Sequence, residues 1–104
     1  MNVIDVPYER RSKLDLYFEI IQAINTGNGR ATRIMSEVNM SYESLKEMLD
    51  SLQKQGIVEV LEAVHFKDKR NYVYYRLTRK GENIYRYLRT ALNNLNDALA
   101  KPPR

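Results

Sequence analysis

The stretch at residues 41–55 constrains the fold most, because it predicts one amphipathic helix with both of its ends marked. Its apolar residues recur at i, i+3, i+4 and i+7 and therefore share one helical face: Leu45, Met48, Leu49 and Leu52. Ser41 precedes this pattern, as an N-cap does, and Gly56 follows it at the place of a C-cap. We therefore expect the rest of the domain to be organised around this helix.

Two further helices are predicted ahead of it. Residues 12–25 have a wide apolar face, and Ser12 with Asp15 three residues later resembles a capping box. Residues 30–38 predict a second, shorter helix with an apolar side. The loop between the two, residues 26–29, carries two glycines and an asparagine, which adopt positive φ at little cost.

A β-hairpin is predicted after the central helix. Residues 57–66 and 72–77 are rich in valine and tyrosine, which favour strands, and residues 67–71 between them are polar, charged and turn-forming. The order helix, turn, helix, hairpin predicts an α+β fold of the winged helix-turn-helix type. That fold has three helices and a two-stranded hairpin, the wing, here with a basic tip.

A long C-terminal helix is predicted at residues 79–100, with Thr78 at its N-cap. Its apolar residues are spaced three and four apart in turn, the heptad pattern of paired helices: Tyr85, Leu88, Leu92, Leu95 and Leu99. At 1.5 Å per residue such a helix reaches roughly 33 Å, so its second half is expected to project from the domain. We predict a dimerisation helix; the alternative is that the heptad seam folds back onto its own domain.

The length and composition indicate one soluble globular domain. A chain of 104 residues builds one hydrophobic core rather than two. It has no cysteine, which excludes disulfides and thiolate metal sites, and neither a signal peptide nor a membrane span is evident. We expect an intracellular protein with a lead at residues 1–11, a winged-helix domain at 12–78, the dimerisation helix at 79–100 and a tail at 101–104.

Basic residues gather in the hairpin and the last helix. The chain carries 17 Lys and Arg against 13 Asp and Glu, a balance that permits a nucleic-acid partner without requiring one. Residues 42–62 contain two basic and five acidic residues, whereas residues 65–89 contain eight basic and two acidic ones. The positive charge is therefore concentrated in the wing and last helix and not in the central helix.

Short sequence motifs follow one another in a defined order over residues 12–99: Lys13-Leu14, Ile20-Ile21-Gln22-Ala23-Ile24, Thr32-Arg33-Ile34-Met35, Met40-Ser41-Tyr42 and Leu77-Thr78-Arg79-Lys80-Gly81. In this order they resemble the small archaeal winged-helix DNA-binding proteins, which occur in crenarchaea and in their viruses and plasmids. The resemblance is to the subfamily that dimerises through a C-terminal antiparallel coiled coil. It implies a homodimer on a shared helical stalk, with the third helix in the major groove and the hairpin at the backbone or minor groove.

The outward face of the central helix departs from this family pattern. Glu43, Glu47, Asp50 and Lys54 lie there, and three acidic groups disfavour deep insertion between phosphates. We therefore expect a tilted helix whose N-terminal end approaches DNA, while Asp50 and Lys54 form an i,i+4 pair in solvent. The predicted DNA contacts are at that end, on the second helix and at the wing tip: Ser41, Tyr42, Ser44, Lys46, Arg30, Arg33, Lys67, Lys69 and Arg70. The alternative for the basic residues is a merely solvated surface.

No catalytic, cofactor or metal site is predicted. His65 is the single histidine and has no cysteine to accompany it, so neither a metal-ligand set nor a Ser-His-Asp set can be assembled. The predicted partners are double-stranded DNA and a second copy of the chain, with no membrane or small-molecule substrate. We expect a non-enzymatic transcriptional regulator or nucleoid-type architectural protein, in the cytoplasm of the cell or, if viral, of its host. The alternative is a protein–protein interaction module that uses the acidic helix without binding DNA.

Overall fold

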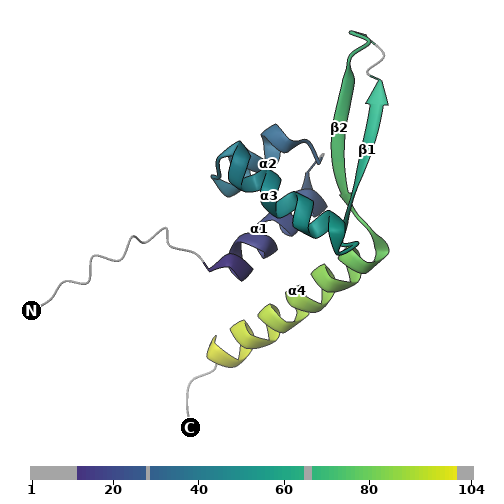
Figure 1. Cartoon of the computed structure of the whole chain (residues 1–104). Coiled ribbons are helices and arrows are strands. Elements are labelled where there is room, and N and C mark those ends of the chain that lie inside the picture. The colour runs from purple at the N-terminus through teal and green to yellow at the C-terminus, as the bar shows by residue number, and fades with distance from the viewer. Residues whose placement is uncertain (1–11, 28, 65–66, 101–104) are drawn as a thin grey trace, which may run out of the picture.

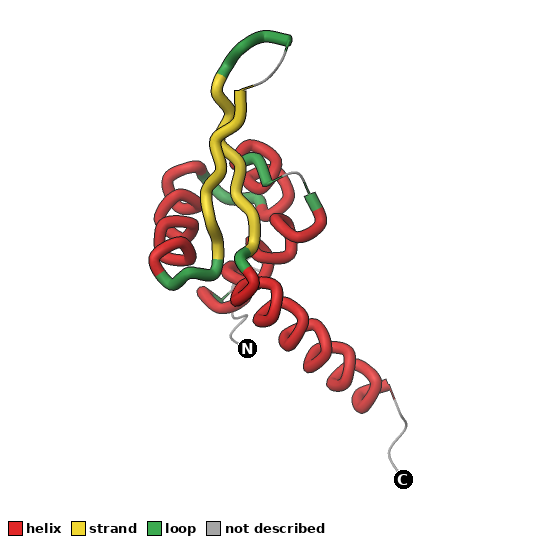
Figure 2. The backbone as a smooth tube through the Cα atoms, turned by 90° about the vertical axis from the view of Figure 1, so that its right-hand side faces the viewer, coloured by secondary structure: helices red, strands yellow, loops and turns green. Residues whose placement is uncertain are grey.

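The computed structural model describes residues 12–27, 29–64 and 67–100. Over these residues four helices and one antiparallel hairpin follow one another: α1 Lys13–Thr26, α2 Ala31–Val38, α3 Tyr42–Lys54, β1 Val58–Val64, β2 Asn71–Leu77 and α4 Arg79–Ala100. Three helices cluster beside the hairpin, and α4 leaves from the hairpin's base at the end opposite the wing tip (Figures 1 and 2). The predicted fold, an α+β winged helix with a long C-terminal helix, is confirmed.

The core lies between α1, α2, α3 and the near half of the hairpin. Its buried hydrophobic side chains include the whole predicted face of α3: Ile20, Ile21, Ala23, Ile24, Ile34, Val38, Leu45, Met48, Leu49, Leu52, Val58, Tyr75 and Leu77. Truncating a fully buried leucine such as Leu49 to alanine costs about 2 to 5 kcal/mol of stability. The apolar face of α1 is narrower than predicted, because Leu14 is 69% exposed at the rim of an apolar groove between α1 and α4.

The helix ends follow the predicted capping chemistry. Ser12 Oγ accepts from the Asp15 N–H at 3.0 Å and the Asp15 carboxylate accepts from the Ser12 N–H at 3.2 Å, which completes the capping box. Ser41 caps α3 by accepting from the Ser44 N–H at 3.2 Å. Each cap satisfies a backbone donor that has no partner within its own helix.

Two residues cap the C-terminal end of α3, whereas the sequence predicted Gly56 alone as the C-cap. Gln55 is the cap residue, and Gly56 follows it with a left-handed φ of 72°. The Gly56 N–H donates to the Gln53 carbonyl at 3.0 Å and the Ile57 N–H to the Leu52 carbonyl at 2.9 Å. These two bonds make a Schellman motif, which reverses the chain direction and delivers it into β1.

The hairpin pairs β1 with β2 from Val58 opposite Leu77 to Val64 opposite Asn71. The first strand begins one residue later than predicted and the second begins one residue earlier, and residues 65–66 of the predicted first strand lie outside the described residues. Successive residues of a strand point to opposite faces, so Tyr75 turns toward the helices while Tyr72 lies on the outer face.

A third, one-residue strand contact joins the hairpin to the loop before α2. The Tyr75 N–H donates to the Gly29 carbonyl at 2.8 Å, and Arg30 forms an isolated antiparallel bridge with Tyr74. Gly29 has φ +77°, and a Cβ there would lie 2.0 Å from the Tyr75 carbonyl oxygen. The predicted glycine loop is therefore also an edge of the sheet, which its sequence pattern did not indicate.

The start of α4 is fixed to the corner between α3 and β1. Thr78 Oγ1 accepts from the Gly81 N–H at 3.1 Å, as predicted for an N-cap, and Lys80 Nζ donates to the Gln55 carbonyl at 2.8 Å. Tyr85 stacks on Phe18 of α1 with ring centroids 6.1 Å apart. Beyond Leu88 every described residue of α4 is exposed, so the predicted projection of its second half is confirmed (Figure 1).

Candidate nucleic-acid interface

The wing tip is an exposed turn built around Asp68. Its carboxylate accepts from the Arg70 N–H at 3.0 Å and from the Tyr72 hydroxyl, while Lys69 takes a left-handed φ of 56°. Lys67, Lys69 and Arg70 are all exposed on this turn. Three cations against one carboxylate leave the tip positive, which is the charge that a phosphate backbone attracts.

Arg30 belongs spatially to the wing, although it precedes α2 in the chain. Its guanidinium lies over the ring of Tyr72, 4.3 Å from the ring centroid, and its backbone pairs with Tyr74. The hydrogen bond to Asp68 raises the pKa of the Tyr72 hydroxyl, with a smaller contribution from desolvation. Tyr72 therefore connects Arg30 to the turn that presents the basic tip.

The N-terminal end of α3 presents a second group of predicted contacts. Ser41, Tyr42 and Ser44 are exposed, and Tyr42 keeps 53% of its surface in solvent. Ser41 Oγ also donates to Ser44 Oγ at 3.0 Å, so both hydroxyls sit at the helix end where N–H groups point outward.

Lys46 contacts two neighbours within the protein that the sequence did not predict. Its ammonium lies 3.2 Å from Asp50 Oδ1 and 3.4 Å from the hydroxyl of Tyr75 in β2. The predicted pair of Asp50 with Lys54 is wrong, because Lys46 reaches Asp50 from the preceding turn of α3 instead. The hydrogen bonds to Asp50 and then to Tyr75 raise the pKa of Lys46, so its charge is retained, although its orientation is set by the protein.

Arg33 stands apart from both groups. It forms an i,i+4 ion pair with Glu37 at 2.7 Å, with both side chains at least a third exposed. Its side chain lies against Gly27 at the end of α1, where a Cβ would approach Arg33 Nε to 2.4 Å. The two arginines that sequence reasoning grouped on one helix therefore point to different neighbours: Arg30 to the wing and Arg33 to α1.

The outward side of α3 is acidic at its exposed positions. Glu43 and Glu47 are both exposed there, and Lys54 lies further along the same helix. A shallow groove between α3 and the start of α1 includes Glu47, Asp50 and Lys13. Glu43 and Glu47 are in contact with water, so this side of α3 presents negative charge to its surroundings.

Sequence reasoning missed the roles of two residues, Asp68 and Tyr72. It took Asp68 as one of the charged, turn-forming residues of the tip, and it took Tyr72 as a residue of the second strand that packs in the sheet rather than stacking on bases. The spacing of an Asp two residues before Arg70 in a polar turn is a signal for an Asx-type turn and could have identified Asp68. The contact of Tyr72 with Arg30 depends on the hairpin register and had no sequence signal.

The heptad seam of α4 divides into two parts. Tyr85 and Leu88 are half-buried against their own domain, whereas Leu92, Leu95 and Leu99 expose 39%, 54% and 74% of their surface. Leu88 also lines the apolar groove whose rim carries Leu14. The exposed leucines therefore continue an apolar surface that begins between α1 and α4.

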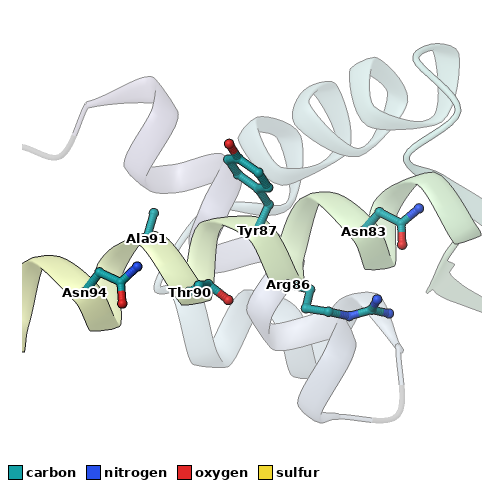
Figure 3. Close-up of a pocket in the computed structure, with 6 residues that line it drawn as sticks. All are labelled: Asn83, Arg86, Tyr87, Thr90, Ala91 and Asn94. Carbon is teal, nitrogen blue, oxygen red and sulfur yellow. The ribbon is translucent and has the colours of Figure 1, made fainter.

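The other side of α4 carries mostly polar side chains, together with Tyr87 and Ala91. Figure 3 shows a shallow groove there, lined by Asn83, Arg86, Tyr87, Thr90, Ala91 and Asn94. At about 100° per residue these positions lie away from the leucine seam. One side of the projecting helix is therefore apolar and the other polar.

No group of three or more His, Cys, Asp or Glu side chains that could hold a metal ion occurs within residues 12–27, 29–64 and 67–100. His65, the single histidine of the sequence, lies outside those ranges. Across the helices that the structure describes, none is long and apolar enough to cross a membrane. The predicted lead and tail, residues 1–11 and 101–104, also fall outside the described part.

Comparison with known proteins agrees with this architecture. Solved structures with the same fold include a PadR-like transcription factor from Bacteroides fragilis, with 20% identity, TM-score 0.69 and coverage of 84% of this chain and 88% of that one. A PadR family regulator from Clostridium difficile matches with 10% identity, TM-score 0.69 and coverage of 81% and 93%. Streptococcus pneumoniae FabT, solved in complex with DNA, matches with 16% identity, TM-score 0.71 and coverage of 96% and 67%.

No curated protein matches the sequence closely. At these identities the solved structures establish the fold alone. The sequence itself, however, matches the winged helix-turn-helix family over residues 10–96, which is most of the chain. The chain therefore belongs to the winged helix-turn-helix family.

Proposed function

We propose that this protein binds double-stranded DNA as a homodimer and acts as a transcriptional regulator or a nucleoid-type architectural protein. The observation that carries the proposal is the wing, where Lys67, Lys69 and Arg70 are exposed on a turn that Asp68 holds in shape. A turn whose backbone is already fixed presents its cations to the phosphates with a smaller ordering cost than a flexible loop would have. FabT, a protein of the same fold, was solved in complex with DNA, which supports the proposal.

The proposed approach to DNA uses two groups of residues. The N-terminal end of α3, with Ser41, Tyr42, Ser44 and Lys46, faces base edges and the adjacent phosphates through hydroxyl and backbone N–H donors. The wing tip and Arg30 contact the backbone beside it. Arg33 makes a lesser contribution, because its charge is already paired with Glu37.

The homodimer follows from the exposed leucines in the second half of α4. From Tyr85 to Leu99 the seam is about 21 Å long at 1.5 Å per residue. An antiparallel pair centred on Leu92 brings Leu99 of one copy to the turn of Tyr85 in the other. The apolar groove and Leu14 open there, so the partner helix would cover Leu14 as well as the exposed leucines.

The free energies of burial and of association indicate that the dimer interface includes Leu14 as well as the leucines of α4. Six leucines, three from each copy, contribute roughly 6 to 12 kcal/mol when their remaining exposed surface is buried. Association itself costs about 4 to 15 kcal/mol in lost rotational and translational freedom. The seam alone is therefore marginal, and the apolar groove supplies the further burial that a stable dimer needs.

We also propose a function for each part of the chain and the kind of organism or virus that encodes it. We assign residues 12–78 to the DNA-binding head and residues 79–100 to the helix that dimerises. The likeness of the sequence motifs to crenarchaeal and viral proteins supports an archaeal or viral source, and a DNA-binding role supports a location inside the cell.

The experiment that tests DNA binding is fluorescence anisotropy of a labelled random duplex of about two helical turns, at low and at moderate salt. Binding that weakens steeply with salt supports phosphate contacts by this protein. An absence of binding to the random duplex at low salt, followed by an absence of any enriched sequence in a target selection, would contradict the proposal.

A second candidate function is favoured by one observation, the exposed acidic side of α3 at Glu43 and Glu47. In this alternative the helix meets a basic protein partner and the chain does not bind DNA. The double variant Glu43→Lys with Glu47→Lys separates the two. Stronger binding of the random duplex by this variant supports an α3 close to phosphates, whereas unchanged binding would remove α3 from the DNA interface.

A further inference from the structure

Arg30 and the wing tip are joined by consecutive contacts along the outer face of the hairpin. The Arg30 guanidinium lies 4.3 Å from the centroid of the Tyr72 ring. The Tyr72 hydroxyl donates to one oxygen of Asp68, and the other oxygen accepts from the Arg70 N–H at 3.0 Å. Arg30 and Arg70 are far apart in the sequence, yet this chain of contacts connects them.

These contacts are not part of the hydrophobic core. Asp68 and Arg70 are exposed and Tyr72 is only half-buried, on the face of β2 opposite to the buried Tyr75. Interactions at such exposed positions add little to the stability of a fold. The arrangement therefore has its main effect on where two cationic residues are held.

Holding those residues matters for binding to phosphate. An arginine side chain that moves freely before it binds a phosphate loses more conformational entropy on binding than most side chains do. A guanidinium held over an aromatic ring samples fewer positions before it binds a phosphate, and its N–H groups remain available as donors. At the tip, the hydrogen bond from the Arg70 backbone N–H to Asp68 fixes the turn from which the Arg70 side chain extends.

We propose that Tyr72 is a positioning residue for binding to the DNA backbone, fixing Arg30 through its ring and the wing tip through Asp68. Arg30 and the tip then engage phosphates as one unit. The inference rests on the proposed DNA-binding function and deepens it, because it names the residue that sets the geometry of the wing contacts.

A double-mutant cycle tests the ring contact, with anisotropy of the random duplex at low salt as the readout. Arg30→Ala and Tyr72→Ala are each expected to weaken binding roughly threefold to tenfold. The double variant is expected to bind no more weakly than the weaker single variant. Tyr72→Phe keeps the ring, so the effect of Arg30→Ala should persist in that background. Fully additive losses would overturn the positioning role.

The direction in which Asp68→Ala changes DNA affinity provides a separate test. If Asp68 acts only as a charge near DNA, Asp68→Ala strengthens binding by removing repulsion. The positioning role predicts weaker binding by Asp68→Ala in spite of its more favourable charge. Asp68→Asn keeps an oxygen that accepts from the Arg70 N–H and should bind at least as well as the wild type. Stronger binding by Asp68→Ala than by the wild type would overturn this part of the proposal.

Two controls separate positioning from folding and from the proposed function. Tyr87→Ala removes an equally sized, 79% exposed ring from α4 and should leave binding unchanged. The denaturation midpoints of the Arg30, Tyr72 and Asp68 variants should remain near that of the wild type. If the wild type binds neither the random duplex nor any sequence from a target selection, the proposed function fails together with this inference. If it binds while the cycle is additive, the inference alone fails.

Discussion

Single glycine residues allow the backbone segments of the winged-helix head to pack closely against one another. Gly29 is the clearest of these, since it combines a left-handed backbone with a hydrogen bond to β2. Gly56 shares the left-handed conformation, φ +72°, but a Cβ added to it would meet no atom of the described residues within 4 Å. Substitution of Gly56 therefore introduces backbone strain alone, whereas substitution of Gly29 introduces both backbone strain and a steric collision.

Gly29→Ala is expected to destabilise the protein more than Gly56→Ala. Both variants place an alanine at positive φ, which costs about 1 kcal/mol, but only at Gly29 does the new Cβ collide with the Tyr75 carbonyl. We expect a loss of roughly 2 to 4 kcal/mol for Gly29→Ala by urea denaturation. Equal losses for the two variants would show that Gly29 does not approach β2 closely.

The ionisation of Tyr72 predicts a loss of stability at alkaline pH. Its pKa is raised above the ordinary value of 10.0 by the hydrogen bond to Asp68, so folding favours the neutral phenol. The stabilising contribution is fully present below the ordinary pKa and is lost as the pH rises through the raised value. Tyr72→Phe should therefore show a smaller fall in stability than the wild type over that alkaline range, as measured by urea denaturation. An identical fall in both would contradict the assigned hydrogen bond.

Secondary-structure elements follow from sequence periodicity, whereas their contacts with one another follow only in part. The face of α3 from Leu45 to Leu52 and its Ser41 cap were predictable, because periodicity and capping are local properties. The pairing of Asp50 with Lys46 rather than with Lys54 could not be predicted, because both lysines lie one helical turn from Asp50. The stacking of Arg30 on Tyr72 depends on the hairpin register, which the sequence pattern left open.

The helix α4 consists of a packed half and a projecting half, and truncation separates them. A chain ending at residue 91 retains the stack of Tyr85 on Phe18 and the burial of Leu88. We expect its head to unfold cooperatively, with a midpoint close to that of a full-length monomer. A chain ending at residue 83 lacks both of these interactions and should be less stable by roughly 2 to 4 kcal/mol. Equal stability of the two truncated chains would contradict the packing of α4 on α1.

The whole molecule is a head with a long arm, 60 Å in its longest dimension although its chain has only 104 residues. The second half of α4 extends away from the head (Figure 1), and in a monomer its leucines are exposed to water. Sequence periodicity predicted the seam, and the structure adds that Leu14 and the groove beside it extend the apolar surface. The proposed assembly therefore draws on two elements, α1 and α4.

Charged substitutions on the two sides of the arm test the proposed dimer. Leu92→Asp with Leu95→Asp places charges in the seam and should yield a monomer in sedimentation equilibrium, because burying them unpaired is costly. The control, Thr90→Asp with Asn94→Asp, adds the same charge to the polar side in Figure 3 and should leave a dimer. A dimer that survives the leucine changes is held by another surface.

The salt dependence of DNA binding by two triple variants tests whether the wing binds the DNA backbone. Lys67→Ala, Lys69→Ala and Arg70→Ala remove three charges from the tip, while Arg79→Ala, Arg86→Ala and Arg89→Ala remove three from exposed positions of α4. Removing one bond to a phosphate lowers the slope of log K against log salt by about 0.9. We expect weaker binding and a flatter slope for the wing variant, whereas the α4 variant should stay close to the wild type. Equal changes in both variants, or an unchanged wing variant, would contradict the binding of the backbone by the wing.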